Sequence, residues 1–374
     1  MNSARIHRLG LTLLLLAFTL CLQAQDGEEG GRFLTEKDWI DWDKAILKPD
    51  TVGKLLITED EGFDITRLKE FKRLRGLILY DYALDDLRFL ADLPKLQILE
   101  LSGNSLRSLD GIDTLRQLRE FMCASNFIRD LSPLDSMRSL RMLKVPDNEI
   151  EDISSIAHMT QLVQLDLGGN PITNLDPIAE WQQLKSFSVY RCTQLQDIGP
   201  IGNWTGLEDL NISFLDLPGF SLATLSAHTN LRSLRVQGMV RSNEELRFIM
   251  HLTKLEQLTM GKNDNVTTLD SLRDLVNLKY LDIHSNNVQD LYPLQNFTKL
   301  VKLVAYRNQI TDISPLLNCR ELRALFIQGN PIKDYGPLFQ MGYIQHLYVN
   351  KQHFDPNQQN QLKKALRTTN IAFE

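Results

Sequence analysis

The chain has 374 residues, of which 43% are hydrophobic, so it is long enough to bury a large core. Its formal net charge at pH 7 is −6, with 47 acidic residues against 41 basic ones. This acidic balance disfavours a nucleic-acid-binding protein, because a phosphate backbone needs a basic face.

The first 24 residues are predicted to be a secretory signal peptide. Two arginines precede an apolar run at 11–22, which is too short to span a bilayer. Cleavage after Ala24 would remove both arginines and no acid, which changes the net charge from −6 to −8. Cys21 offers a lipoprotein alternative, which is less favoured because Leu20 stands where a lipobox has a small residue. The predicted location is secreted, periplasmic or at the cell surface.

Residues 25–48 are predicted to form a tether and an N-terminal cap. The stretch "QDGEEGG" has the composition of a solvated tether, and "FLTEKDWIDWDKAIL" carries seven large apolar side chains. We expect the second stretch to be helical, with Thr35 at its start. It would cover the open end of the segment that follows.

From residue 49 to residue 352 the sequence repeats the frame L-x-x-L-x-L-x-x-N in 14 turns, mostly 22 residues long. Alternating leucines lie on one face of a short strand, and stacking of neighbouring turns buries them. A buried Asn at the end of the frame can bond the backbone of the loop that leaves the strand. We interpret these residues as a structural ladder: Asn104, Asn126, Asn148, Asn170, Asn263, Asn286, Asn308 and Asn330.

The second half of many turns reads like "IRDLSPL" at 128–134 or "ITDISPL" at 310–316. With the leucine frame, these letters resemble the leucine-rich repeat family, and in particular the 22-residue class of bacterial internalins. The resemblance covers roughly four-fifths of the chain. It implies an α/β solenoid, a right-handed superhelix of about 14 turns. Its concave side would be a parallel β-sheet, and its convex side would hold mostly 3₁₀ and short helices.

The stretch 192–263 departs from the frame, because its turns are longer and several lack Asn at the end of the frame. We expect the curvature to change there and the sheet to be less regular. Ser242 followed three residues later by Glu245 is a capping-box pattern. It predicts a regular helix at about 243–251 on the convex side.

Residues 353–374 are predicted to cap the other end. Asp355 before Pro356 is a helix-start signal, and we expect a helix to about Arg367 and a last strand at 370–374. No membrane tail and no wall-sorting signal is visible in the sequence, so no anchor is predicted.

No HExxH, P-loop, G-x-S-x-G or GxGxxG motif occurs, so no catalytic residue, metal ligand or cofactor is predicted. The acidic "EDEGFD" at 59–64 offers a calcium alternative, but it lacks EF-hand spacing and a solvated loop is preferred. Cys123, Cys192 and Cys319 are expected to be buried free thiols, separated by too many turns for a disulfide. Four N-x-S/T sequons would matter only in a eukaryotic secretory route.

A ligand-binding surface is predicted on the concave face, at the letters six, four and two places before the Asn position. In the last turns these letters include aromatic residues that the frame does not require, and interface hot spots favour such side chains. A sheet surface that merely tolerates aromatics is the alternative. Tyr190 and Arg191 form a weaker, secondary patch. The main candidates are Tyr280, Asp282, His284, Lys302, Tyr306, Arg307, Phe326, His346 and Tyr348.

The sequence therefore predicts a secreted, monomeric, non-enzymatic protein whose concave face recognises a protein ligand. The internalin resemblance implies a protein partner, sometimes on a host or cell surface. One alternative is an intracellular scaffold of the phosphatase-regulatory type, which shares the 22-residue repeat. Another is a glycan-binding surface protein, because stacked Tyr and Phe suit sugars. Neither nucleic acid nor an integral membrane segment after signal cleavage is predicted, and the identity of the partner is left open.

Overall fold

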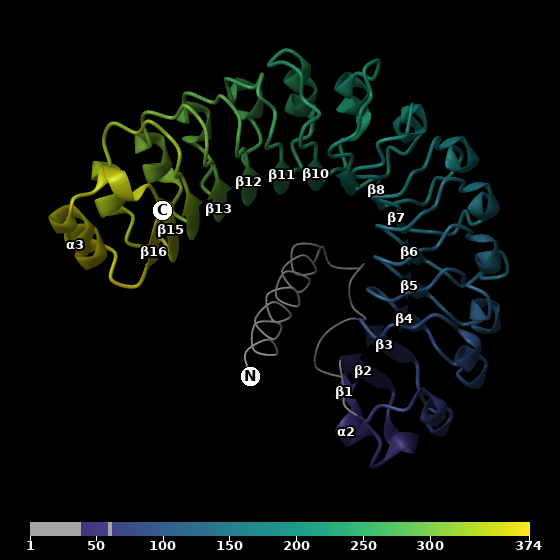
Figure 1. The fold of residues 1–374 in the computed structure, drawn as a ribbon. Helices are drawn as coiled ribbons and strands as arrows, with labels where there is room; N and C mark the ends of the chain where they lie inside the picture. Colours follow the sequence, from purple (N-terminus) through teal and green to yellow (C-terminus); the bar gives the residue numbers. More distant parts are fainter. Residues whose placement is uncertain (1–38, 59–61) are drawn as a thin grey trace.

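The computed structural model describes residues 39–58 and 62–374, and the structural statements below concern this part of the chain. Its strands form one open sheet of sixteen strands, in which each strand pairs in parallel with its neighbours in sequence. Figure 1 shows the strands along the inner side of an arc and the short helical segments along its outer side. The predicted solenoid is therefore confirmed.

Most strands are three residues long, because only the L-x-L part of each turn alternates with a period of two. The strands are β1 (Ile40–Asp41), β2 (Lys54–Thr58), β3 (Gly76–Tyr80), β4 (Ile98–Glu100), β5 (Glu120–Met122), β6 (Met142–Lys144), β7 (Gln164–Asp166), β8 (Ser186–Ser188), β9 (Asp209–Asn211), β10 (Ser233–Arg235), β11 (Gln257–Thr259), β12 (Tyr280–Asp282), β13 (Lys302–Val304), β14 (Ala324–Phe326), β15 (His346–Val349) and β16 (Asn370–Phe373).

The return segments are 3₁₀ helices, because Asp and Pro in the second half of a turn favour tight turns. Asp312 shows how: its carboxylate accepts hydrogen bonds from the Ser314 backbone N (2.8 Å) and Oγ (2.7 Å) where a 3₁₀ helix begins. These helices are η2 (Pro49–Thr51), η3 (Ile65–Glu70), η4 (Arg88–Asp92), η5 (Ile112–Thr114), η6 (Ser132–Leu134), η7 (Ser154–Ile156), η8 (Asp176–Ile178), η9 (Gly199–Asn203), η10 (Leu222–Ala227), η11 (Glu245–His251), η12 (Asp270–Leu272), η13 (Tyr292–Leu294), η14 (Ser314–Asn318), η15 (Gly336–Gln340) and η16 (Lys351–His353).

The core lies between the sheet and these 3₁₀ helices. Leu281, Leu303 and Leu325 stand opposite one another on neighbouring strands, and each is completely buried. Burying such a side chain contributes on the order of 2 kcal/mol before chain entropy is subtracted. Because each turn packs on the next, one apolar column runs along the solenoid.

The Asn ladder bonds each turn to the turn before it. Asn148 donates from Nδ2 to the carbonyls of Cys123 (2.8 Å) and Val145 (3.1 Å). Its Oδ1 accepts from the backbone N of Ile128 at 3.0 Å. Cys192 stands in the same position and makes only a 3.3 Å thiol contact with the Leu167 carbonyl. The amide therefore satisfies backbone groups that a shorter or apolar side chain leaves unpaired.

The irregular stretch keeps its strands in the common sheet, since β8 to β11 pair in parallel without a break. The regular helix predicted at 243–251 is wrong in type, because the segment is the 3₁₀ helix η11. A three-residue period places Leu246, Ile249 and Leu252 on one side, and all three are buried. Packing of this apolar row therefore overrides the capping signal.

One of the two capping bonds predicted at this helix forms, and the other is displaced by one residue. The Ser242 Oγ accepts from the backbone N of Glu245 at 3.1 Å, as the pattern requires. The Glu245 carboxylate accepts from the backbone N of Arg241 at 2.8 Å, rather than from Ser242 itself.

Both ends of the described solenoid are covered. At the start, β1 pairs with β2, and Trp42 in α2 (Trp42–Ala45) packs edge to face on Phe63 with ring centroids 4.8 Å apart. At the end, α3 (Pro356–Ala365) begins with a complete capping box between Asp355 and Gln358. It ends two residues before the predicted Arg367, and β16 then pairs with β15.

Some predictions lie outside the described residues. They are the signal peptide at 1–24, the tether, the helix start at Thr35 and residues 59–61 of the acidic stretch. Within the described part, no helix is long and apolar enough to cross a membrane.

Candidate ligand-binding surface

The predicted concave residues lie on β12 to β15. Tyr280, Lys302, Ala324 and His346 are direct partners on successive strands. Leu281 and its equivalents between them point into the core. Alternate residues therefore face the hollow of the arc. We call the following residues the aromatic patch: Tyr280, Lys302, Tyr306, Phe326, His346 and Tyr348.

Two pairs of rings stack across neighbouring strands in this patch. Phe326 and Tyr348 have ring centroids 4.4 Å apart and planes at 16°. His284 and Tyr306 have centroids 4.9 Å apart and planes at 20°. Equal turn lengths put each ring beside its counterpart one turn later, so the sheet itself aligns the stacks. Such pairs contribute about 0.5–1.5 kcal/mol beyond area burial, and the four side chains are thereby ordered before any ligand arrives.

Lys302 lies between two of the rings. Its ammonium is 5.2 Å from the centroid of Tyr280 and 5.4 Å from that of Phe326. Both distances are in the cation–π range. No carboxylate among the described residues forms an ion pair with Lys302. The rings therefore hold a positive charge at the surface without neutralising it.

Asp282 and His284 were predicted as contact residues, but their side chains are largely buried, with residue exposures of 8% and 7%. The two form a close pair, with His284 Nδ1 2.6 Å from the Asp282 carboxylate. His284 packs on Gly261, where an added Cβ would lie 2.4 Å from its ring. These residues support Tyr306 from beneath.

The buried carboxylate also affects the phenols around it. Burial, and after it the charge of Asp282, raises the pKa of both Tyr280 and Tyr306. Both tyrosines are therefore neutral hydrogen-bonding groups at physiological pH.

Arg307 and His346 are exposed at the margins of the patch. Arg307 follows β13 with a left-handed backbone (φ 54°), and its N donates to the Gln328 carbonyl at 2.8 Å. This conformation turns the chain sharply out of the strand, which leaves the guanidinium beside the patch.

The secondary patch is separate from the aromatic patch, because β9, β10 and β11 lie between them. The Tyr190 ring lies over Gly168, where an added Cβ would be 2.2 Å from the ring. Its hydroxyl donates to the Asp147 carboxylate at 2.9 Å. Tyr190 is therefore fixed across two turns, and only Arg191 is fully exposed.

The opening turns carry an apolar group on the concave face that the sequence analysis missed. Ile98, Met122 and Met142 are buried there, and Trp39 packs against them. Their places, six or four before the Asn position, follow the same rule that located the aromatic patch. What the rule lacked was the path of the chain start, which brings Trp39 over them.

Replacing Glu100 by Gln is expected to increase stability at neutral pH and to flatten the pH dependence of stability. Burial raises the pKa of this carboxyl, so the folded state binds its proton more tightly than the unfolded state. The stabilisation is present below the unfolded-state pKa and is lost as pH rises through the folded-state pKa. The Gln oxygen can still accept from the Ser102 backbone N, which the carboxylate does at 2.7 Å.

Urea unfolding from about pH 4 to pH 8 measures this effect, since that range begins near the ordinary Glu pKa. The exposed Glu321→Gln variant is the control and should follow the wild type. Equal loss of stability with rising pH in Glu100→Gln and the wild type would contradict the expectation.

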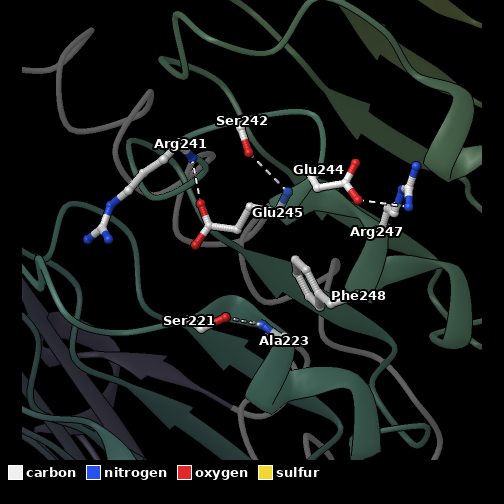
Figure 2. Close-up of a pocket in the computed structure, with 8 residues that line it drawn as sticks. All are labelled: Ser221, Ala223, Arg241, Ser242, Glu244, Glu245, Arg247 and Phe248. Carbon is white, nitrogen blue, oxygen red and sulfur yellow. Dashed lines mark hydrogen bonds and ion pairs between the residues drawn. The ribbon is translucent and has the colours of Figure 1, made fainter.

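A shallow depression on the convex side lies between η10 and η11, and Figure 2 shows its lining residues. Its polar groups bond one another: Glu245 accepts from the Arg241 backbone, and Glu244 pairs with Arg247 at 2.7 Å. These self-satisfied groups leave nothing poised for a ligand, so the depression is not a candidate site.

The three thiols are buried and free. Burial raises the pKa of Cys192 to about 12 and that of Cys319 to about 11, and it also raises the pKa of Cys123. They are therefore protonated and act as small apolar side chains. Among the described residues, no group of three or more His, Cys, Asp or Glu could hold a metal ion.

The fold and this surface define a curved solenoid of leucine-rich turns with an aromatic patch on its concave sheet. A family model described as "Leucine Rich repeats (2 copies)" matches residues 94–136, 138–180 and 276–318. The chain therefore contains leucine-rich repeats, and its fold is similar to that of an internalin.

Solved structures agree in fold. The internalin InlF of Listeria monocytogenes is 24% identical with a TM-score of 0.63, and the match covers 79% of this chain and 86% of that chain. A leucine-rich repeat protein of Leptospira interrogans is 19% identical with a TM-score of 0.63, covering 89% and 98%. The plant peptide hormone receptor RGFR1, in complex with RGF2, is 18% identical with a TM-score of 0.56, covering 86% and 59%. A search of curated proteins found no match.

Proposed function

We propose that this chain is a secreted, non-enzymatic binding protein whose aromatic patch grips a protein ligand. The observations that carry the proposal are the two pairs of stacked rings and the Lys302 ammonium, which lies between Tyr280 and Phe326 without a carboxylate partner among the described residues. The repeat frame uses its leucines and asparagines for the fold, so it does not account for ordered rings on the opposite face. Ordered aromatic side chains lose little conformational entropy on binding and are typical of interface hot spots.

Two further observations support a protein ligand. The receptor RGFR1, which shares the fold, was solved in complex with RGF2, so a solenoid of this type holds a partner in that relative. The Tyr306 phenol, whose pKa is raised by burial, also adds a protonated hydroxyl beside the rings. The predicted signal peptide supports secretion. The internalin resemblance supports a role in adhesion to a host or cell surface, which is part of the same proposal.

A glycan ligand is the second candidate, favoured by the parallel stacking of Phe326 on Tyr348. Flat, stacked rings present a surface on which a sugar ring can also lie. Screening the mature protein on protein arrays and glycan arrays separates the two candidates. Pull-down from the native surroundings with mass spectrometry then identifies the ligand.

The triple variant Tyr306→Ala, Phe326→Ala, Tyr348→Ala is expected to lose binding to the identified ligand by roughly a hundredfold or more, as removal of a hot-spot cluster does. The matched control is Val276→Ala, Tyr292→Ala, Phe339→Ala, which removes exposed apolar side chains elsewhere on the surface. Titration calorimetry on both variants decides the matter. Unchanged affinity in the first variant would refute the patch.

A further inference from the structure

Within the aromatic patch, Ala324 is a short side chain between longer ones, and we call the position above it the notch. This small residue is the direct partner of Lys302 on one side and of His346 on the other. The two flanking Cα atoms are about 10 Å apart, because parallel strands are spaced by about 4.8 Å. Ala324 remains partly exposed between them. The row therefore reads lysine, alanine, histidine, so a single methyl group stands between two longer side chains.

The wall beside the notch is aromatic. Phe326 and Tyr348, which lie two residues further along the same strands as Ala324 and His346, stack face to face. The Lys302 ammonium lies between the Tyr280 ring on β12 and the Phe326 ring on β14, 5.4 Å from the centroid of Phe326. An anion in the notch would meet a cation on one side and a ring surface beside it.

The electrostatic setting favours an anion. The chain as a whole carries −6, yet the ionisable side chains around the notch are the partly exposed Lys302 and the exposed Arg307 and His346. Asp282, which lies in the adjacent row with Val304 and Phe326, is buried and paired with His284. Within the described residues, none of these three side chains forms an ion pair that would compete with a ligand.

We propose that the notch over Ala324 receives the carboxylate of an Asp or Glu side chain from an extended segment of the protein ligand, and that an apolar side chain next to it packs on Phe326 and Tyr348. A charge-assisted hydrogen bond from Lys302 and a hydrogen bond from the His346 imidazole hold the carboxylate. This inference rests on the proposed function and specifies the ligand's chemistry.

The test uses two synthetic peptides, acetyl-Gly-Ser-Phe-Glu-Phe-Ser-Gly-amide and the same sequence with Gln in place of Glu. Mature protein labelled with ¹³C at alanine methyl groups is titrated with each, and the Ala324 methyl signal is followed by NMR. The Glu peptide is expected to shift this signal and to bind roughly tenfold more tightly than the Gln peptide, as a charged hydrogen-bond partner does.

Two variants locate the effect. Lys302→Met keeps the length of the side chain without its charge and should abolish the preference for Glu over Gln. Ala324→Leu fills the notch and should lower the affinity for the Glu peptide by roughly tenfold or more. Thr259→Leu, on the partly exposed concave surface of β11, is the matched control and should change neither affinity. Circular dichroism checks that all three variants remain folded.

Several outcomes would overturn the inference. Equal binding of the two peptides, no Ala324 shift at millimolar peptide, or binding indifferent to Ala324→Leu would each do so. A shift by sialyllactose without one by the Glu peptide would assign the notch to an acidic glycan instead. If the natural ligand loses binding to the aromatic triple variant but not to Lys302→Met or Ala324→Leu, the proposed function stands and this inference falls.

Discussion

Replacing Asn148 by Ala is expected to lower the free energy of unfolding by roughly 3 kcal/mol or more, because each buried polar group left unpaired costs about 1–3 kcal/mol. The substitution removes the bonds to the carbonyls of Cys123 and Val145 and to the backbone N of Ile128. All of these groups belong to loops that water does not reach freely. Urea unfolding followed by circular dichroism measures the loss.

The control is Asn287→Ala, which removes one exposed bond, from Nδ2 to the Asp264 carbonyl at 2.6 Å. It should cost less than about 1 kcal/mol, as exposed hydrogen bonds usually do. If the two variants lose equal stability, the ladder is not what holds neighbouring turns together.

Replacing Leu362 by Asp is expected to detach the C-terminal cap, with a loss of roughly 3–5 kcal/mol from burying a charge where a leucine was fully enclosed. Leu362 is the one buried side chain of α3, with 0% of its surface exposed. The cap covers the last apolar turn, so its release exposes core side chains to solvent. Thermal unfolding and light scattering should show a lower midpoint and more aggregation.

The exposed Lys364→Asp variant introduces the same residue on the same helix, with a larger change of charge, and should remain close to the wild type. Ligand binding should also fall in Leu362→Asp, because β16 pairs with β15 and Tyr348 lies directly opposite Ala372. A stable, non-aggregating Leu362→Asp protein would show that the solenoid does not depend on this cap.

The architecture could be predicted because it follows from a period. The spacing between Phe326 and Tyr348 equals one turn, so their neighbouring positions required no knowledge of long-range packing. The depth of Asp282 and His284 could not be predicted in this way. It depends on the missing side chain of Gly261 in the preceding turn and on the Tyr306 ring in the next.

Local signals were less reliable where packing competed with them. The Ser242–Glu245 pattern correctly located a helix start, yet the spacing of Leu246, Ile249 and Leu252 selected the 3₁₀ form. The group around Trp39 was missed for a different reason, because its position depends on how the chain enters the first turn. Neither effect is encoded in a single window of sequence.

The order of the sixteen strands determines how ligand binding would change amide hydrogen exchange along the chain. Every strand is bonded only to its immediate neighbours in sequence. A molecule resting on β12 to β15 would therefore slow amide hydrogen exchange in those turns and the ones beside them, and its effect would fade along the chain. The binding site of an unidentified ligand could thus be located as one continuous range of protected residues.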